Sequence, residues 1–593
     1  MGNTGKKAMA KNINPIRLEL LSNALASMCD NMLGLVVRTA RSTNIKNTMD
    51  FAATVCDPQG QLVAQGVALP AQLGSMMPAL KGCLAWVGDD FNEGDIIASN
   101  DPYAGASHLN DVFMFKPVFV GGERVAILGL ILHHTDLGGR VPGGNATDST
   151  EIFQEGLRIP PCKIYEQGRP NVALFRVIEH NTRVPHRVMG DIRAQIATLD
   201  GGEVELRTII SEFGVADYKA YTTELLNYTE RLARANIAAL PDGVVEFTDW
   251  NDDDGAGPGA GPVKLHVTIT KRGEEFTLDF TGTDPAGRGA LQPNLHFTTS
   301  CACAALRTVI DPDIPNNAGF FRVVKVIAPE GSFLNPRFPA ATGARGQVGF
   351  RIRNLVFGAL AQLLPDRIPA CTGGSEFGIV FAGYELNEKK ERKPFLHLEY
   401  HNTTGQGGGP VSDGQDAGPY CIGNLANVPV EIVEAESPLR VEQYAFLPDT
   451  GGAGKYRGGL GIVRQYRLLN EEATVQLRSD RHLHPCWGLH GGQPGALARS
   501  TLNPDTDHTE KLPSKFVRKM KKGDVFRAEM PGSGGYGHPF ERDPEAVRRD
   551  VLQGKVTREH ARSAYGVVID AKTLAVDFAA TQRTRASQAH LPG

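Results

Sequence analysis

The sequence predicts a mixed α+β protein of several subdomains, β-rich, with glycine-rich turns and a long N-terminal helix. Its 593 residues correspond to about three to four domains of about 150 residues each. Glycine contributes 67 residues and proline 37, which indicates many tight turns and argues against a helical bundle. Apolar residues recur at helical spacing near the N-terminus, whereas later segments form strand-like runs around turn sequences.

These patterns predict the main helices and hairpins. A long amphipathic helix is predicted over residues 15–41, where the periodic apolar positions are Leu18, Leu21, Leu25, Met28, Met32 and Leu35. Three β-hairpins are predicted, each from two apolar runs around a short turn: 51–55 with 61–64, 112–120 with 124–132, and 263–270 with 276–280. Further helices are predicted over about 191–237, 349–364, 543–553 and 557–565.

Composition excludes several classes of function. The chain has 62 Lys+Arg against 66 Asp+Glu and no basic stripe, so we expect no nucleic-acid partner. No uncharged apolar run approaches 18 residues, and the first residues lack the apolar core of a secretory signal, so no membrane partner is expected. Nine scattered cysteines without a CxxC pair are typical of a reducing compartment, which predicts a cytoplasmic location.

The strongest candidate for a chemical site lies at the open end of the second predicted hairpin. If its turn centres on Gly122, then Asp111 lies opposite His133, and cross-strand Cβ atoms are about 4.5–5.5 Å apart. His108, three residues before Asp111, can curl back to the same point. Two imidazoles and a carboxylate form a donor set suited to Zn, Mn or Fe, with positions left open for water. A metal ion held there could activate a water molecule for hydrolysis.

Several alternatives stay open on the residues alone. A shift of one residue in the turn would pair Asp111 with His134, and the histidines could simply be strand-end and loop residues. Arg345 and Arg351, near the start of a predicted helix, could bind an anion, although we favour a salt-bridged face. Residues 451–459 could contact a phosphate, although we favour a bulged hairpin whose glycines supply positive φ.

Longer strings point to a family. Along nearly its whole length the chain contains, in order, Arg41-Ser-Thr-Asn-Ile-Lys46, Leu73-Gly-Ser-Met76, Asn100-Asp-Pro-Tyr103, His108-Leu-Asn-Asp111, His133-x-x-Asp136-Leu-Gly-Gly139, Pro438-Leu-Arg-Val-Glu442 and Gly451-Gly-Ala-Gly-Lys-Tyr-Arg-Gly-Gly459. Together these strings resemble the hydantoinase B/5-oxoprolinase family. The family comprises ATP-dependent hydantoinases, 5-oxoprolinases, lactamases and ketone carboxylases.

The resemblance implies a B subunit that works with a larger A subunit. In this family ATP is bound on the A subunit, which phosphorylates the carbonyl oxygen of the substrate, and we expect an α2β2 hetero-oligomer. The sequence has no GxxxxGK[ST] motif, which agrees with an ATP site on the partner. The B subunit of the family carries one divalent metal ion (Zn, Mn or Fe), and the resemblance implies the ligands Asp50, His108, Asp111 and His133.

We also place His134 and Asp136 at this centre as catalytic residues. For Asp136 we favour a carboxylate that orients a ligating histidine, while the roles of Asp101, Asp136 and His134 stay open. On this basis we divide the chain into an N-terminal metal-bearing domain (1–245), a central mixed α/β domain (246–430) and a C-terminal glycine-rich β domain with terminal helices (431–593).

The predicted function is hydrolysis of a carbonyl-phosphorylated cyclic amide, such as a hydantoin, oxoproline or lactam. Phosphorylation of the carbonyl oxygen turns a resonance-stabilised amide into a better electrophile. Two alternatives are a subunit of an ATP-dependent acetone or acetophenone carboxylase, and a non-catalytic structural subunit. Relatives commonly have a histidine two residues before Leu-Gly-Ser-Met, where this sequence has Ala71 and Gln72. If that position touches the substrate, the specificity of this chain differs from that of the commonest members.

Overall fold

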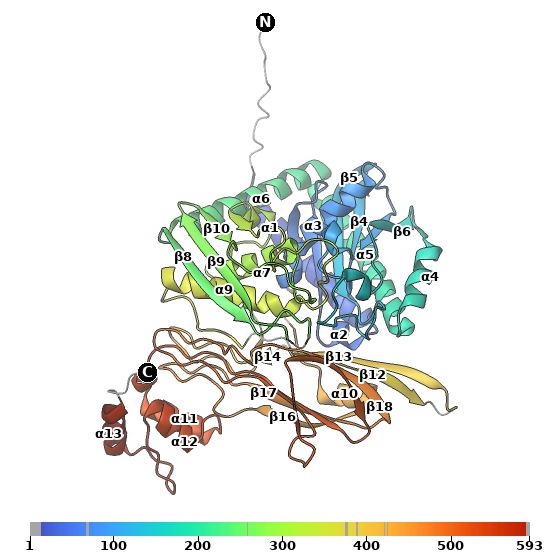
Figure 1. Ribbon diagram of the computed structural model, residues 1–593. Helices are drawn as coiled ribbons and strands as arrows, with labels where there is room; N and C mark the ends of the chain where they lie inside the picture. Colours follow the sequence, from blue (N-terminus) through green and yellow to red (C-terminus); the bar gives the residue numbers. More distant parts are fainter. Residues whose placement is uncertain are drawn as a thin grey trace.

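The computed structural model describes residues 13–588, except 67–69, 258, 374–376, 387–388, 402, 420–421 and 424. Two units of helices packed on sheets form one half of the molecule, and a β-sandwich with terminal helices forms the other half (Figure 1). The predicted α+β class with several subdomains is confirmed.

The first unit is built on a seven-stranded antiparallel sheet in the order β2-β1-β5-β4-β3-β6-β7. Its strands are β1 (Phe51–Cys56), β2 (Leu62–Gln65), β3 (Ile96–Ser99), β4 (Asp111–Val120), β5 (Glu123–His133), β6 (Cys162–Glu166) and β7 (Arg169–Pro170). Its helices are α1 (Pro15–Thr39), α2 (Thr43–Lys46), α3 (Pro70–Val87), α4 (Val172–Asn181), α5 (Pro185–Phe213) and α6 (Val215–Ala238).

Both faces of this sheet are covered by helices. Successive residues of a strand point to opposite faces, so Val112 and Met114 of β4 join the core formed with α1 and α5. Phe113 and Phe115 point the other way and pack with α3. The hairpins predicted at β1–β2 and β4–β5 are confirmed, and the helix predicted over 191–237 is two helices, α5 and α6, that meet at Gly214.

By length and composition, α1 could cross a membrane, and it is the one such helix in the described part of the chain. Most of its apolar face is buried in the core of the first unit, where Leu21, Leu25 and Met28 are covered completely. An amphipathic helix that packs on a sheet has this composition, so the apolar face of α1 is accounted for by the fold.

The second unit has a four-stranded sheet in the order β11-β10-β9-β8. Its strands are β8 (Gly243–Asn251), β9 (Val263–Arg272), β10 (Glu275–Asp279) and β11 (Val324–Ile327), and its helices are α7 (Leu295–Arg307), α8 (Ala318–Phe321) and α9 (Gly346–Leu363). Cys301 and Cys303 of α7 are buried in its core. The predicted hairpin β9–β10 and the predicted helix α9 are confirmed.

The third unit is a sandwich of two sheets, with orders β13-β12-β18-β21 and β16-β17-β22-β19-β20. Its strands are β12 (Phe377–Leu386), β13 (Arg392–His401), β16 (Leu439–Phe446), β17 (Ile462–Leu468), β18 (Glu472–Arg478), β19 (Arg499–Leu502), β20 (Glu510–Leu512), β21 (Lys515–Lys521) and β22 (Val525–Glu529). Short elements complete it: β14 (Thr403–Thr404), β15 (Gly418–Pro419), α10 (Val430–Glu436), α11 (Pro544–Leu552), α12 (Arg558–Tyr565) and α13 (Phe578–Gln588).

The sandwich lies directly against the first unit. Phe377, Ile379 and Phe381 of β12 face the interior of the sandwich, whereas Val380 on the other face joins the core of the first unit, together with Tyr400 of β13. The structure therefore places β12 and β13, which we assigned to the central domain 246–430, in the C-terminal sheet. Long-range strand pairing of this kind leaves no local signal in the sequence.

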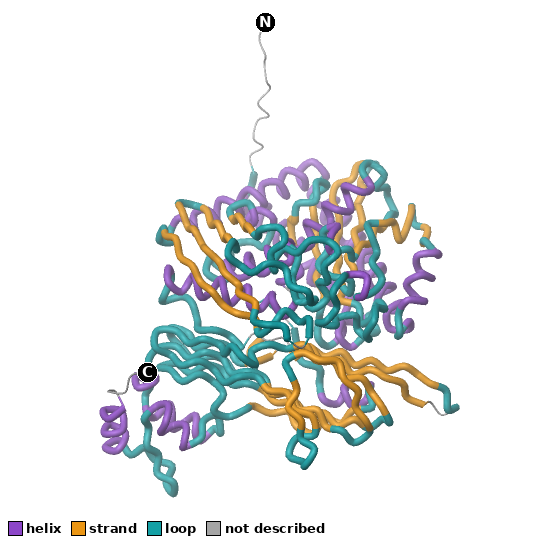
Figure 2. Tube along the Cα trace, in the orientation of Figure 1, coloured by secondary structure: helices purple, strands orange, loops and turns teal. Residues whose placement is uncertain are grey.

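The glycine-rich segments 405–414, 451–461, 488–495 and 531–537 form a stack of extended loops beside the sandwich (Figure 2). Their backbones bond to one another: Gly408 N donates to Gly534 O at 2.9 Å, and Gly452 N donates to Ser533 O at 2.8 Å. The bulged hairpin with positive-φ glycines predicted for 451–459 is wrong, because none of these glycines has a positive φ. Glycine is needed here for close approach of backbones rather than for turn geometry.

Gly532→Ala is expected to lower the free energy of unfolding by about 3 kcal/mol, the upper end of the usual range for overpacking. A Cβ at this position would lie 1.7 Å from the carbonyl oxygen of Thr450, which is backbone and cannot rotate away. The measurement is the midpoint of chemical denaturation. Gly261→Ala is the matched control, because a Cβ there meets nothing within 4 Å. Equal midpoints for the two variants would contradict this account of the stack.

Candidate functional site

The open end of the β4–β5 hairpin brings Asp111 opposite His133, as predicted. The turn residues are Gly121 and Gly122, with φ of 62° and 79°, as in the two-residue turns that suit hairpins. A regular hairpin from this turn would pair Asp111 with Leu132. A β-bulge, in which Phe119 pairs with Arg124 and Val118 with Ala126, leaves Val125 unpaired and shifts the register by one residue. The predicted pair is therefore correct, but the bulge produces it.

His108 reaches the same point from the loop before β4. The backbone N–H of Asp111 donates to the carbonyl of His108 at 3.1 Å, which closes a turn and folds the loop back on the strand. Asn110 holds this loop next to the end of β5, because its Nδ2 donates to the carbonyl oxygen of His134 at 2.9 Å. The predicted curl of the His108 segment is thus confirmed.

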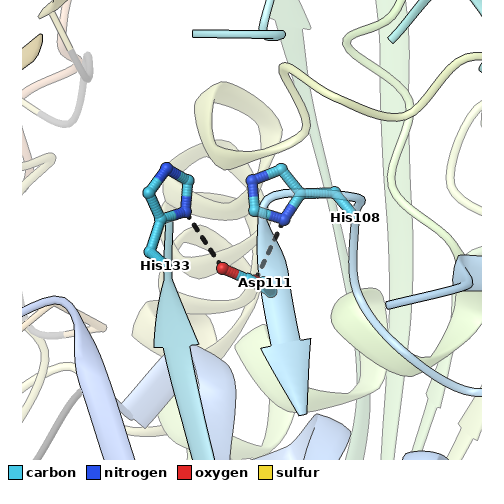
Figure 3. Close-up of side chains that lie close together, drawn as sticks. All are labelled: His108, Asp111 and His133. Atoms are coloured by element: carbon cyan, nitrogen blue, oxygen red, sulfur yellow. Dashed lines mark hydrogen bonds and ion pairs between the residues drawn. The ribbon is translucent and has the colours of Figure 1, made fainter. Parts of the chain in front are cut away.

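The three side chains form one compact group (Figure 3). His133 Nδ1 lies 3.0 Å from Asp111 Oδ1, and His108 Nδ1 lies 3.1 Å from Asp111 Oδ2. The imidazole rings of His108 and His133 stack with their centroids 4.9 Å apart. One donor atom from each residue lies within 4.8 Å of the other two, and all three residues are buried.

Burial and neighbouring charges set the protonation of this group. Burial, helped by the charge of Arg345, lowers the pKa of His108 to about 3, so that its ring is neutral. Burial opposes the ionisation of Asp111, but the pKa of that carboxyl is held well below its usual range by His108, by Arg345 and by its hydrogen bonds. Arg345 Nη2 donates to Asp111 Oδ2 at 2.6 Å. Neutral imidazole and ionised carboxylate are the forms that bind metal ions.

Asp50 lies beside this group but not in it. Asp50 Oδ2 is 3.8 Å from His133 Nδ1, outside hydrogen-bond distance, and Asp50 Oδ1 accepts a hydrogen bond from Gln72 Nε2 at 2.6 Å. The structure therefore gathers His108, Asp111 and His133 closely and places Asp50 next to them.

The group faces a pocket with about 550 Å³ of empty space, part of it open to solvent. Two cationic side chains line it, Arg345 and Arg478. The other lining side chains include the polar Asp50, Gln72, Asn145 and Tyr400 and the apolar Phe297, Phe350, Ile422 and Leu425. Polar groups that converge in a partly apolar cavity are typical of a small-molecule site.

Comparison with known proteins shows the family of this chain. A family model described as hydantoinase B/oxoprolinase matches residues 14–539. The chain belongs to the hydantoinase B/oxoprolinase family. The chain is 32% identical to the B subunit of a putative D-/L-hydantoinase from Pseudomonas sp. (strain NS671) over 575 residues, which are 94% of this chain and 96% of that protein. It is 31% identical to the beta subunit of the caprolactamase from Pseudomonas jessenii over 586 residues, with 97% and 99% covered.

Solved structures give the same result. The crystal structure of the ATP-dependent caprolactamase from Pseudomonas jessenii matches with a TM-score of 0.90 at 30% identity, covering 97% of this chain and 100% of that chain. A nucleotide-free structure of acetone carboxylase matches with a TM-score of 0.88 at 20% identity, covering 97% and 83%, and shows a shared fold. Two of these hydantoinase B relatives are named as subunits.

The two residues predicted to be catalytic do not line the pocket. His134 follows His133 and points to the opposite side, where it is buried near Asp191 and Gln195 of α5. Asp136 accepts hydrogen bonds from Arg183 Nη1 at 2.9 Å and from the backbone N–H of Gly143 at 3.0 Å, so it ties together two loops. Neither side chain enters the pocket, because strand alternation and loop anchoring direct both of them away from it.

Other predicted residues divide between the site and the scaffold. Asp101 forms a turn by accepting from the backbone N–H of Tyr103 at 3.0 Å. Arg351 joins a buried ion-pair network, as favoured from the sequence, but Arg345 contacts Asp111 in the pocket. Sequence reasoning missed Tyr400, whose hydroxyl lies 2.8 Å from His133 Nε2 and orients that ring. Tyr400 comes from β13, far along the chain, and no local pattern indicates it.

Proposed function

We propose that this chain is the B subunit of an ATP-dependent cyclic amidohydrolase, which opens a lactam, hydantoin or oxoproline ring activated by a partner subunit. The observation that carries the proposal is the buried group of His108, Asp111 and His133 at the wall of a pocket that also holds Arg345 and Arg478. The names of the relatives, a putative hydantoinase and a caprolactamase, support the substrate class.

The donor set fits one divalent metal ion. His108 Nδ1 is fully buried and lacks a hydrogen bond of good geometry among the described residues, as expected of an atom that awaits an ion. His108, Asp111 and His133 would hold the ion and Asp50 would lie beside it, a nitrogen and oxygen set that suits Zn, Mn or Fe. When bound, such an ion supplies Lewis acidity and lowers the pKa of water.

The remaining residues of the pocket bind and orient the substrate. The apolar side chains of Phe297, Phe350 and Leu425 suit a small hydrocarbon ring and exclude water from its faces. Arg345 and Arg478 offer positive charge to an anionic group on the substrate, such as the phosphoryl group that activates the carbonyl oxygen. Tyr400 keeps the ring of His133 in position through its hydroxyl.

The proposal requires a partner that binds ATP. The family resemblance implies a larger A subunit for this role, in a complex that we propose to be α2β2. The nucleotide would be consumed on the partner, and the activated ring would reach the pocket described above.

The experiment that tests this function is ATP hydrolysis by the purified two-subunit complex, screened over hydantoins, oxoproline, lactams and ketones, with metal analysis of the same sample. We expect ATP hydrolysis that depends on a cyclic amide, release of a ring-opened amino acid or carbamoyl amino acid, and about one divalent ion per chain. Bicarbonate-dependent consumption of a ketone would instead identify a carboxylase. If the partner were fully active without this chain, then this chain would have only a structural role in the complex.

A further inference from the structure

The side chain of Gln72 forms part of the pocket wall and is almost fully buried, at 2% exposure. It lies in the first turn of α3. Its Nε2 donates to Asp50 Oδ1 at 2.6 Å. Asp50 is in turn next to His133, so Gln72 sits beside the group that we propose to hold the metal ion.

The orientation of the Gln72 amide follows from this contact. The amide nitrogen donates to the Asp50 carboxylate and so faces it, and the amide oxygen therefore points elsewhere. Gln72 Oε1 is buried and has no hydrogen-bond partner among the described residues. A buried carbonyl oxygen without a donor costs free energy, and here a molecule in the pocket can supply the missing donor.

We propose that Gln72 Oε1 accepts a hydrogen bond from the ring N–H of a cyclic amide, which the carbonyl-phosphorylated ring keeps as an iminium N–H, and that this contact selects the substrate class. The inference rests on the proposed function. In every secondary cyclic amide the N–H is bonded to the reacting carbonyl carbon, so a ring held by its N–H next to Asp50 presents that carbon close to His133. A ketone has no N–H, and an N-methylated amide has lost it. Both would leave the oxygen of Gln72 without a donor.

The test is direct binding to the two-subunit complex without ATP, measured by calorimetry. The ligands are ε-caprolactam, N-methylcaprolactam and cycloheptanone, which have the same ring size. We expect the wild type to prefer the lactam over both analogues by about tenfold or more. Methionine at position 72 has a similar length but no carbonyl. In Gln72→Met the ratio of the affinity for the lactam to the affinity for the ketone should therefore fall to about one. Gln59→Met, a change at an exposed position, should leave the preference unchanged.

Three outcomes would overturn the inference. The first is equal affinity of the wild type for the lactam and the ketone, which decides the matter even if Gln72→Met fails to assemble. The second is an unchanged preference in Gln72→Met. The third is loss of the divalent metal from Gln72→Met, which would make Gln72 a metal ligand. If the complex opens cyclic amides but gives any of these three results, the proposed function still holds and only the role of Gln72 is refuted. If the complex opens no cyclic amide at all, the proposed function itself is refuted.

Discussion

Replacing Asp111 with Asn is expected to lower turnover of the reconstituted complex by about a thousandfold or more, with loss of bound divalent metal. Asp111 is the only carboxylate among the three gathered residues, and both histidines and Arg345 contact it. The amide of Asn carries no charge, so it neither attracts a cation nor balances Arg345. The measurements are ring opening at saturating ATP and metal content by mass spectrometry.

The matched control for Asp111→Asn is His134→Gln, a change in the buried neighbour of His133. Because His134 does not line the pocket, this variant should keep its metal and most of its activity. Gel filtration of both complexes shows whether the subunits still assemble. Full activity of Asp111→Asn, or a loss in His134→Gln as large as in Asp111→Asn, would contradict the catalytic assignment.

Arg351→Met is expected to destabilise the protein by about 3–5 kcal/mol, the usual effect of removing one partner from a buried ion pair. The guanidinium of Arg351 is fully buried and lies 2.6 Å from Asp480 and 3.3 Å from Asp249. It joins α9 to β8 and to the loop after β18, and therefore joins the second unit to the sandwich. Methionine fills much of the same volume but leaves two buried carboxylates with less positive charge. The midpoint of urea denaturation measures the effect.

The defect of Arg351→Met should also depend on pH. Burial opposes ionisation of Asp480, but the charge of Arg351 lowers the pKa of that carboxyl to about 2. Without Arg351 the pKa values of Asp480 and Asp249 rise in the folded state, so folding takes up protons as the pH falls. The difference in stability from the wild type should therefore be largest near pH 8 and smaller near pH 5. Arg322→Met, at a partly exposed ion pair with Glu230, should change stability by less than about 1 kcal/mol at either pH. A difference in stability between the wild type and Arg351→Met that grows toward pH 5 would contradict the role given to Arg351.

Local patterns predicted the elements that build the site. Apolar spacing predicted the helix that is α1, and alternating runs around Gly121 and Gly122 predicted the hairpin of β4 and β5. Spacing also placed His108 near Asp111, because a turn of three residues needs no distant partner. These features are local, since each depends on residues within a few tens of positions along the chain.

The rest of the pocket could not be predicted from local patterns. Arg345 was considered as an anion-binding residue, but only its approach to Asp111 separates it from Arg351, which is part of the scaffold. Tyr400 reaches His133 because one face of the sandwich sheet packs on the first unit. Neighbouring residues of a strand point to opposite faces, so the sequence already indicated that His133 and His134 point to opposite sides. The prediction that both residues serve the site did not take this alternation into account.

Short-range chemistry therefore specified the amphipathic helix, the hairpins and the spacing of the metal-type residues in this chain, because neighbours along the backbone set the hydrophobic period and the turns. Packing between distant segments settled the glycine stack and the walls of the pocket. The contact between Gly532 and Thr450 arises only when separate segments meet, and its energy depends on which surfaces come together.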